Sequence, residues 1–250
     1  MQRPFPDEWR AIIRDNVAMF ETLTAEEQAE LERLVLVFLD EKNFEGAGGL
    51  ELTDEMKVMV AAQACFLLLH RDTDIYPELQ SIVLYPSAYK AKKVDVLGSG
   101  IVVENEQGRL GESWHRGLVV LAWDAVQRGT TNADDGRNVV LHEFAHQLDQ
   151  EDGVADGAPD LDSRESRRSW AQVLGAEYAD LQHHVHVGRE SDIDEYGATH
   201  PAEFFAVVTE MFFEQGQKLE RNHPELYEQL ARFYRQDPAS RPVPKRLSGP

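Results

Sequence analysis

The residues Asn138-Val-Val-Leu-His-Glu-Phe-Ala-His-Gln-Leu-Asp149 contain two histidines, His142 and His146, four positions apart. On an α-helix this spacing corresponds to about 400° of rotation, so both imidazoles leave the same face one turn apart. Two neutral ring nitrogens placed in this way can bind one Zn²⁺ at about 2.0–2.1 Å. Glu143, directly after the first histidine, can then take a proton from a water activated by the metal. The spacing therefore predicts a catalytic zinc site on a helix.

The residues around this motif favour a buried helix. No proline or glycine interrupts residues 138–150. Apolar residues cover a broad helical face: Val139, Val140, Leu141, Phe144, Ala145 and Leu148. The alternative is a core helix with two hydrogen-bonded histidines and a solvated glutamate. Because burying two imidazoles and a carboxylate together is costly without a metal or polar partners, we favour the metal site.

The composition bounds the class of protein. A chain of 250 residues with 42% hydrophobic residues can form one large domain or two small ones, each with a real core. The formal net charge is −20, and Lys and Arg do not cluster outside the C-terminal tail. Since phosphate backbones are bound through clustered cations, we expect no direct nucleic-acid partner.

The expected location is the cytoplasm. Cys65 is the single cysteine, so no internal disulfide is possible, and its apolar surroundings predict a buried side chain. The N-terminus lacks the apolar stretch of a signal peptide. No uncharged run reaches the roughly 18 residues of a membrane span, so no membrane partner is expected.

The pattern along the chain predicts helices around a small sheet. Thr24 is placed to cap a helix from Ala25 to about Asn43, and Thr53 or Asp54 a second one ending near His70. Short β-branched or aliphatic runs predict three or four strands, at 81–85, 94–97, 101–103 and 118–123. Further helices are expected at about 163–183, 201–215 and 224–235.

These elements suggest a division of the chain. A helical N-terminal region, residues 1–75, would pack on a catalytic domain of residues 76–236. Residues 237–250 contain four prolines and are expected to form a disordered tail. The loop 149–162 is rich in acid and glycine but lacks the spacing of an EF-hand, so the sequence does not favour a calcium site there.

A catalytic zinc needs a third protein ligand, and Glu203 is a candidate. Pro201 is placed like a first helical residue, which puts Glu203 in the first turn of a strongly apolar helix. A carboxylate at such a buried helix start is explained if it binds metal. The alternative is that it only supports the helix N-terminus. On the pattern alone, Glu210 and Glu177 remain rivals.

Six segments together resemble the Mlc titration factor A family of zinc metallopeptidases, a glutamate-zincin group. The segments are Gly111-Glu-Ser-Trp114, Leu118-Val-Val-Leu-Ala-Trp123, Asn138 to Asp149 as quoted above, Ile193-Asp-Glu-Tyr196, Pro201-Ala-Glu-Phe-Phe-Ala-Val207 and Phe233-Tyr-Arg-Gln-Asp-Pro238. They span most of the chain from about residue 80 onward. The combination is far more specific than the two-histidine motif alone.

The resemblance implies a fold, a metal site and an activity. The fold would be α+β and mostly helical, a zincin-like domain with a small β-sheet beside the motif helix. The metal would be a single Zn²⁺ on His142, His146 and Glu203, with Glu143 as the general base. The activity would be hydrolysis of peptide bonds in short peptides, with an aminopeptidase-like preference left open.

The resemblance also draws attention to Tyr196, seven residues before Glu203. Its phenol could donate a hydrogen bond to the oxyanion that forms when water adds to a peptide carbonyl. The alternative is that Tyr196 packs beneath a loop. Asp149, three residues after His146, could orient a ligand imidazole, or simply begin the acidic loop.

The sequence departs from the family at one point. Members can carry a further histidine, upstream of the Gly-x-Ser-Trp segment, that approaches the zinc. The stretch 102–108 has no histidine, so that contact is not carried over. Glu104, Glu106 and the nearby His115 stay unassigned.

A second hypothesis comes from the name of the family, which reflects binding of the transcriptional repressor Mlc. The chain would then act chiefly by sequestering a repressor, with catalysis secondary. Every residue that hydrolysis needs is present, and this favours an enzyme. A zinc-dependent hydrolase of non-peptide amides is a third, weaker alternative.

Overall fold

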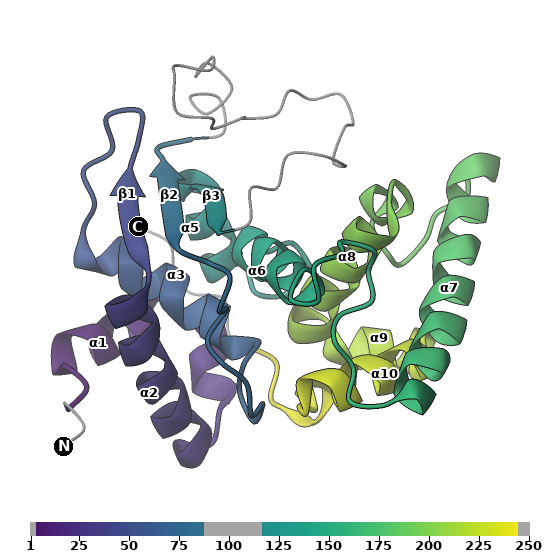
Figure 1. Ribbon diagram of the computed structural model, residues 1–250, viewed down its shortest axis with the longest axis horizontal. Helices are drawn as coiled ribbons and strands as arrows, with labels where there is room; N and C mark the ends of the chain where they lie inside the picture. The colour runs from purple at the N-terminus through teal and green to yellow at the C-terminus, as the bar shows by residue number, and fades with distance from the viewer. Residues whose placement is uncertain (1–3, 88–116, 245–250) are drawn as a thin grey trace.

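A three-stranded parallel sheet lies on one side of the structure (Figure 1). The computed structural model describes residues 4–87 and 117–244. The strands, in spatial order, are β1 (Asn43–Gly46), β2 (Ser81–Tyr85) and β3 (Leu118–Ala122). In the register, Ile82 of β2 lies opposite both Phe44 and Val119. β2 is buried from Ile82 to Tyr85, as expected for a central strand of a parallel sheet.

The sequence predicted two of these strands. The predictions at 81–85 and 118–123 are confirmed, except that Trp123 begins a helix. The predictions at 94–97 and 101–103 lie outside the described residues. β1 was not predicted, because its Asn-Phe-Glu-Gly sequence has no β-branched residue and we placed Asn43 at the end of a helix.

Helices from the N-terminal region pack against each other (Figure 1), and Phe38 in one of them lies with its ring centroid 6.2 Å from that of Phe44 in β1. They are α1 (Asp7–Asn16), the short 3-10 helix η1 (Ala18–Thr22), α2 (Ala25–Glu41) and α3 (Asp54–Phe66). The predicted N-cap Thr24 is confirmed: it forms a reciprocal capping box with Glu27. Thr53 caps α3, whose residues from Val58 to Phe66 are all buried.

The second half of the chain is helical. It contains α5 (Trp123–Thr131), α6 (Val139–Asp149), α7 (Arg164–Val187), η2 (Glu195–Ala198), α8 (Pro201–Glu214), α9 (Gly216–Asn222), α10 (Pro224–Tyr234) and η3 (Pro238–Ser240). The predicted helices starting at about 163, 201 and 224 are confirmed. The short helices α5 and α9, like α1, were not predicted.

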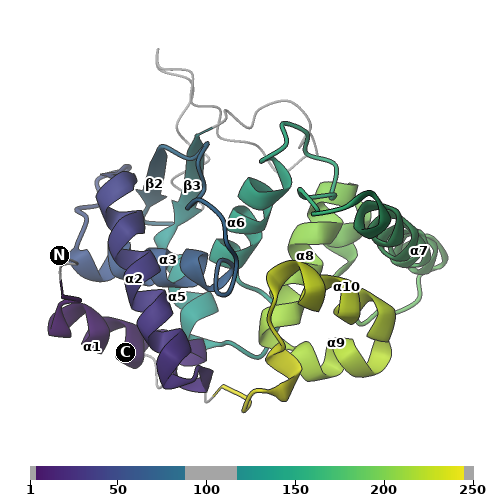
Figure 2. The ribbon, with the colours of Figure 1, turned by 60° about the horizontal axis from the view of Figure 1, so that its bottom comes forward.

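α6 occupies the centre of the molecule. In both ribbon views it lies between the sheet with α3 on one side and α8 on the other (Figures 1 and 2). Phe144 of α6 reaches into the N-terminal region, with its ring centroid 4.9 Å from that of Tyr76 and 5.7 Å from that of Phe38. The fold is thus α+β and mostly helical, with a small sheet beside the motif helix, as predicted.

The C-terminal residues connect the two halves of the structure. Tyr227 donates a hydrogen bond of 2.5 Å to Asp237, and Arg241 binds Glu27 of α2 at 2.6 Å. Residues 237–241, which the sequence placed in a disordered tail, therefore fold onto the rest of the protein. The division at residue 75 stays a prediction, although β1 lies in the same sheet as β2 and β3.

Within residues 4–87 and 117–244, no helix combines the length and the apolar character needed to cross a bilayer.

The loop after α6 packs against the start of α8 at Gly157. The Gly157 N–H donates to Asp149 at 3.0 Å, and its carbonyl accepts from the indole of Trp170 at 2.9 Å. Gly157 has φ of +78°, and a Cβ there would lie 2.4 Å from the carbonyl oxygen of Pro201. Only glycine therefore fits against the first turn of α8.

We predict that Gly157→Ala destabilises the fold more than Gly188→Ala does. Both glycines have positive φ, but a Cβ at Gly188 meets no atom within 4 Å. Gly188→Ala should cost about 1–2 kcal/mol from backbone strain alone, and Gly157→Ala about 1–3 kcal/mol more from the clash. Urea unfolding of both variants measures the difference, and equal losses would contradict the packing argument.

The contacts of Glu27 make the stability of the fold depend on pH. Glu27 accepts hydrogen bonds from the Thr24 N–H and Arg241, and its carboxylate lies 3.1 Å from the His70 imidazole. Burial raises its pKa, but these bonds outweigh that effect and lower it to about 2. A lowered folded-state pKa stabilises the fold above the ordinary value of 4.5, and this contribution is lost as the pH falls from 4.5 to 2.

We therefore predict that Glu27→Gln lowers the melting temperature at pH 7 and that the deficit shrinks towards pH 2. Thermal unfolding followed by circular dichroism at several pH values measures this. Glu228→Gln, which removes an exposed partner of Arg232 on α10, is the control and should show little effect. A deficit independent of pH would mean that the Glu27 charge is not involved.

Candidate metal centre

His142 and His146 leave α6 on the same side, as the four-residue spacing predicts. α6 begins with Asn138, whose side-chain oxygen accepts hydrogen bonds of 3.1 Å from the N–H groups of Val140 and Leu141. The two imidazole Nε2 atoms lie 3.3 Å apart. His146 is 2% exposed, whereas His142 is half-buried. The motif thus presents two nitrogen donors at one point.

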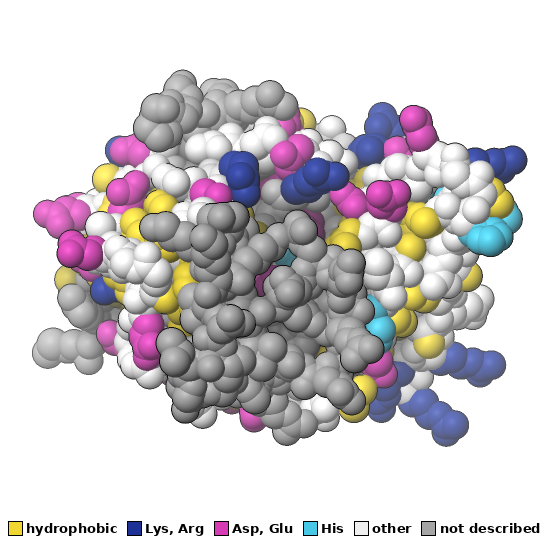
Figure 3. All heavy atoms as spheres, turned by 90° about the horizontal axis from the view of Figure 1, so that it is seen from above, with side chains coloured by type: hydrophobic (Ala, Val, Ile, Leu, Met, Phe, Trp, Pro, Cys, Tyr) yellow, Lys and Arg dark blue, Asp and Glu magenta, His cyan; other side chains and the backbone are white. Residues whose placement is uncertain are grey.

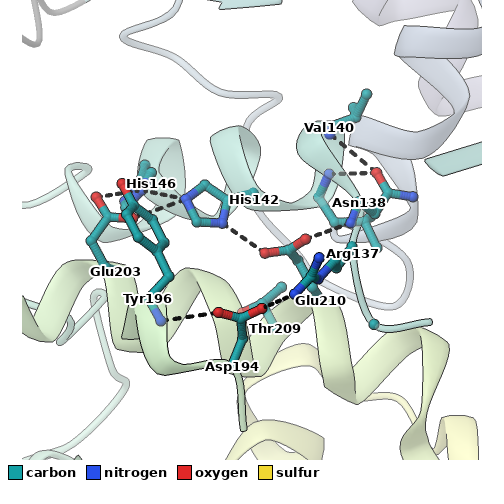
Figure 4. Close-up of polar contacts among 12 residues, drawn as sticks. Arg137, Asn138, Val140, His142, His146, Asp194, Tyr196, Glu203, Thr209 and Glu210 are labelled. Atoms are coloured by element: carbon teal, nitrogen blue, oxygen red, sulfur yellow. Dashed lines mark hydrogen bonds and ion pairs between the residues drawn. The ribbon is translucent and has the colours of Figure 1, made fainter. Parts of the chain in front are cut away.

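Glu203 brings a carboxylate to the same point from α8. Pro201 is the first residue of α8, as predicted, and Glu203 lies in the first turn with 1% of its surface exposed. One carboxylate oxygen lies 3.0 Å from Nε2 of His142, and the other lies 3.5 Å from Nε2 of His146 (Figure 4). Of the three candidates that the pattern left open, Glu203 is the one that joins the histidines.

This donor set fits a zinc ion. A tetrahedral site with metal–ligand distances of about 2.0–2.1 Å has edges of about 3.3–3.4 Å. The two Nε2 atoms lie 3.3 Å apart, and Nε2 of His142 lies 3.0 Å from one Glu203 oxygen, both close to that edge. The other Glu203 oxygen lies 3.5 Å from Nε2 of His146. Two imidazoles with one carboxylate form a set that zinc uses in catalytic sites. Among the described residues, these three alone meet the spacing expected of a metal site.

The same contacts shift the pKa values of the donors. Burial lowers the pKa of His142, but the hydrogen bonds with Glu203 and Glu210 outweigh it and raise the pKa well above its usual value. Burial raises the pKa of Glu203, and its bonds to the two histidines lower it to about 2. Glu203 therefore stays a carboxylate and can serve as a ligand.

Glu143 follows His142 on the same helix and does not join the donor cluster. Within the described part of the chain, its buried Oε2 has no hydrogen-bond partner. Burial raises the pKa of Glu143, which makes the carboxylate a stronger base. A buried, unpartnered carboxylate oxygen beside two metal-type histidines is available to accept a proton.

Glu210 contacts His142 at the ring nitrogen that faces away from Glu203. One carboxylate oxygen lies 2.7 Å from Nδ1 of His142, and the other accepts a short hydrogen bond from the Asn138 N–H. If Nδ1 carries the proton, Nε2 keeps its lone pair for a metal. Glu210, a rival ligand on the pattern, thus contacts the nitrogen of His142 that faces away from the donor cluster. The third rival, Glu177, lies on α7 and binds His223 at 2.8 Å.

Asp149 is fully buried and fixes the loop after α6. Its Oδ2 accepts from the Gly157 N–H, and burial raises its pKa to about 7. Glu210 makes the outer contact to the His142 imidazole. Within the described part of the chain, Oδ1 of Asp149 has no hydrogen-bond partner, and the His146 imidazole acts electrostatically to lower the pKa of Asp149. A role of Asp149 in orienting the His146 imidazole therefore stays a prediction.

Tyr196 lies beside the donor cluster, at the start of η2 (Figure 4). Its ring centroid is 6.0 Å from that of His142, and 43% of its surface is exposed. Tyr196 also lines a cavity of about 690 Å³ together with His142, Val207, Glu210 and eight further residues. Among the described residues, the side chain therefore lines the cavity next to the site, and its role stays a prediction.

Glu104, Glu106 and His115 lie outside the described residues. The contribution of Glu214 was not predicted from the sequence. Its carboxylate accepts from the backbone N–H groups of Gly136 and Arg137 at 3.0 and 3.1 Å. The signal was present: Glu203, Glu210 and Glu214 are spaced by seven and four residues, which places all three on one face of α8.

A mostly helical α+β domain, whose central helix and neighbouring helix bring two histidines and a glutamate together, is the kind of domain found in metallopeptidases. The chain belongs to the family of glucose-regulated metallo-peptidases M90, whose model matches residues 1–235. The resemblance to the Mlc titration factor A family is confirmed.

Relatives match over most of the chain. An uncharacterized protein of Synechocystis sp. is 40% identical over 238 residues, covering 95% of this chain and 86% of that protein. Mlc titration factor A of Serratia proteamaculans is 33% identical over 221 residues, covering 86% and 83%. The protein of the same name from Salmonella gallinarum is 31% identical over 228 residues, covering 90% and 85%.

We predict that Glu210→Gln weakens zinc binding about 10- to 100-fold, because the His142 imidazole loses its charged partner. Competition with a chromogenic chelator measures the affinity. Glu214→Gln is the matched control: it lies one turn further along α8, and burial raises the pKa of Glu214 to about 8, so its side chain is mostly neutral at pH 7 already. Equal losses in the two variants would argue against a specific role for Glu210.

Proposed function

We propose that this protein is a zinc-dependent metallopeptidase that hydrolyses short peptides. The observation that carries the proposal is the convergence of His142, His146 and Glu203 at distances that suit one metal ion. Membership in a metallopeptidase family supports it. When bound, zinc would polarise the scissile carbonyl and lower the pKa of its water.

The residues of the chain would have distinct roles in this reaction. His142, His146 and Glu203 would hold the ion, with Glu210 fixing the ring of His142. Glu143 would accept the proton of the attacking water and later pass it to the leaving amine. The phenol of Tyr196 would donate a hydrogen bond to the oxyanion.

The cavity beside His142 and Tyr196 is where a substrate would lie. Its volume of about 690 Å³ is sufficient for a short peptide. Its lining is mixed, with apolar Val139 and Val207 beside the charged Arg137 and Asp194. An aminopeptidase-like preference remains part of the proposal, to be tested with peptides blocked at either end.

A second candidate function is sequestration of a transcriptional repressor. Relatives named Mlc titration factor A, which match most of the chain at 31–33% identity, favour this candidate. The partner would be the repressor protein itself, with no direct contact to nucleic acid, and the location would be the cytoplasm. On the face shown in Figure 3, described Lys and Arg side chains lie among Asp and Glu side chains, which is not a typical phosphate-binding surface.

We predict that Glu143→Gln abolishes peptide hydrolysis while zinc binding and any repressor binding persist. The amide cannot accept the proton, but Glu143 is not part of the donor cluster. Chromogenic peptides, with a parallel panel of non-peptide amides, measure hydrolysis, and metal analysis measures zinc. A variant as active as the wild type would refute the mechanism, and repressor binding without hydrolysis in either protein would favour the second function.

Metal analysis tests the site itself. Wild-type protein purified with zinc should contain one equivalent, and His142→Ala should lose most of it. His184→Ala, which changes a histidine of α7 outside the cluster, should retain the metal. If His142→Ala keeps a full equivalent, zinc is bound elsewhere.

A further inference from the structure

We propose that the ion pair between Arg137 and Asp194 is a positioning device that holds Tyr196 beside the metal centre. This inference rests on the function proposed above. Arg137 precedes the N-cap of α6, and Asp194 is the N-cap of η2, the short helix that carries Tyr196. The pair thus joins the helix that bears the histidines to the segment that bears the tyrosine (Figure 4).

Asp194 makes two bonds with its two carboxylate oxygens. Oδ1 accepts from the N–H of Tyr196 at 3.0 Å, and Oδ2 accepts from the guanidinium of Arg137 at 2.7 Å. The first bond sets where the η2 turn begins, and the second sets where Asp194 lies relative to α6. A shift of Asp194 would therefore move the Tyr196 backbone relative to His142.

Arg137 is itself held by α8. Its backbone N–H donates to Glu214 at 3.1 Å, and the next residue, Asn138, donates to Glu210. The backbone of Arg137, from which the guanidinium extends, is therefore held in position. The resulting chain of contacts runs from Glu214 through Arg137 and Asp194 to Tyr196, whose ring lies 6.0 Å from that of His142.

The position of the Arg137–Asp194 pair at the cavity favours a functional role over a role in the stability of the fold. Arg137 and Asp194 line both the cavity of about 690 Å³ beside His142 and a second one of about 530 Å³. The side chains are 75% and 30% exposed, so the pair contributes little to the stability of the fold. An ion pair this exposed can fix a local geometry while leaving the core unaffected.

Arg137→Ala should lower kcat about three- to fivefold, the range of an exposed pair, with KM changed less than twofold. Asp194→Asn keeps an oxygen for the Tyr196 N–H but loses the charge for Arg137, so it should match Arg137→Ala. Asp194→Ala should lower kcat further, and Arg137→Lys should lower kcat less than Arg137→Ala does. Arg232→Ala, which removes an exposed ion pair on α10, is the control and should behave like the wild type.

A double-mutant cycle separates positioning of Tyr196 from a general structural effect. In the background of Tyr196→Phe, Arg137→Ala should have no further effect on kcat, because its target has lost the hydroxyl. Additive losses, or a Tyr196→Phe variant as active as the wild type, would overturn the proposal. High salt should lower kcat of the wild type but not of Arg137→Ala, since screening weakens an exposed pair.

Hydrogen exchange of the metal-free protein gives a readout that does not depend on activity. Arg137→Ala and Asp194→Asn should each speed amide exchange in residues 194–199, whereas Arg232→Ala should not. Unchanged exchange in both variants would refute the positioning role. If the wild type does not hydrolyse peptides, the proposed function fails, and faster exchange still supports the link between Arg137 and η2.

Discussion

The packing of α6 against α8 through buried carboxylates is the constraint on which the site depends. Glu203, Glu210 and Glu214 form one stripe along α8, and each is less than 10% exposed. Burying three carboxylates on one helix is costly unless each finds donors. α6 and the residues before it supply them: two imidazoles, the backbone N–H groups that precede the helix, and the positive end of its dipole. The interface therefore satisfies the hydrogen-bonding needs of these carboxyl groups and also brings His142, His146 and Glu203 together.

The sequence predicted the parts of the site whose information is local. The spacing of His142 and His146 fixes their common face, and Pro201 places Glu203 in a first helical turn, so these predictions needed no tertiary knowledge. The choice among Glu203, Glu210 and Glu177 did need it. Only the docking of α8 on α6 decides which carboxylate faces the inner nitrogens and which the outer one.

The features that the sequence did not predict share a physical cause, which is that each depends on contacts between distant residues. β1 is four residues long and becomes a strand only because β2 lies beside it. Residues 237–241 look disordered by composition, yet their order comes from contacts with distant residues such as Glu27. The role of Arg137 depends on Asp194, 57 positions away. Patterns that repeat along a helix are visible in a sequence, whereas single contacts between distant residues are not.

Because the three candidate metal donors lie far apart along the chain, the stability of the protein in the cell would depend on the metal. His142 and His146 are neighbours in any helical fragment, but Glu203 follows 57 residues after His146. An unfolded polypeptide can offer a cation only the weaker histidine pair, so an ion at this site would bind the folded chain in preference and stabilise it by mass action. Scarcity of the metal would thus expose the polypeptide to degradation, and cellular abundance of the protein would follow the supply of the ion.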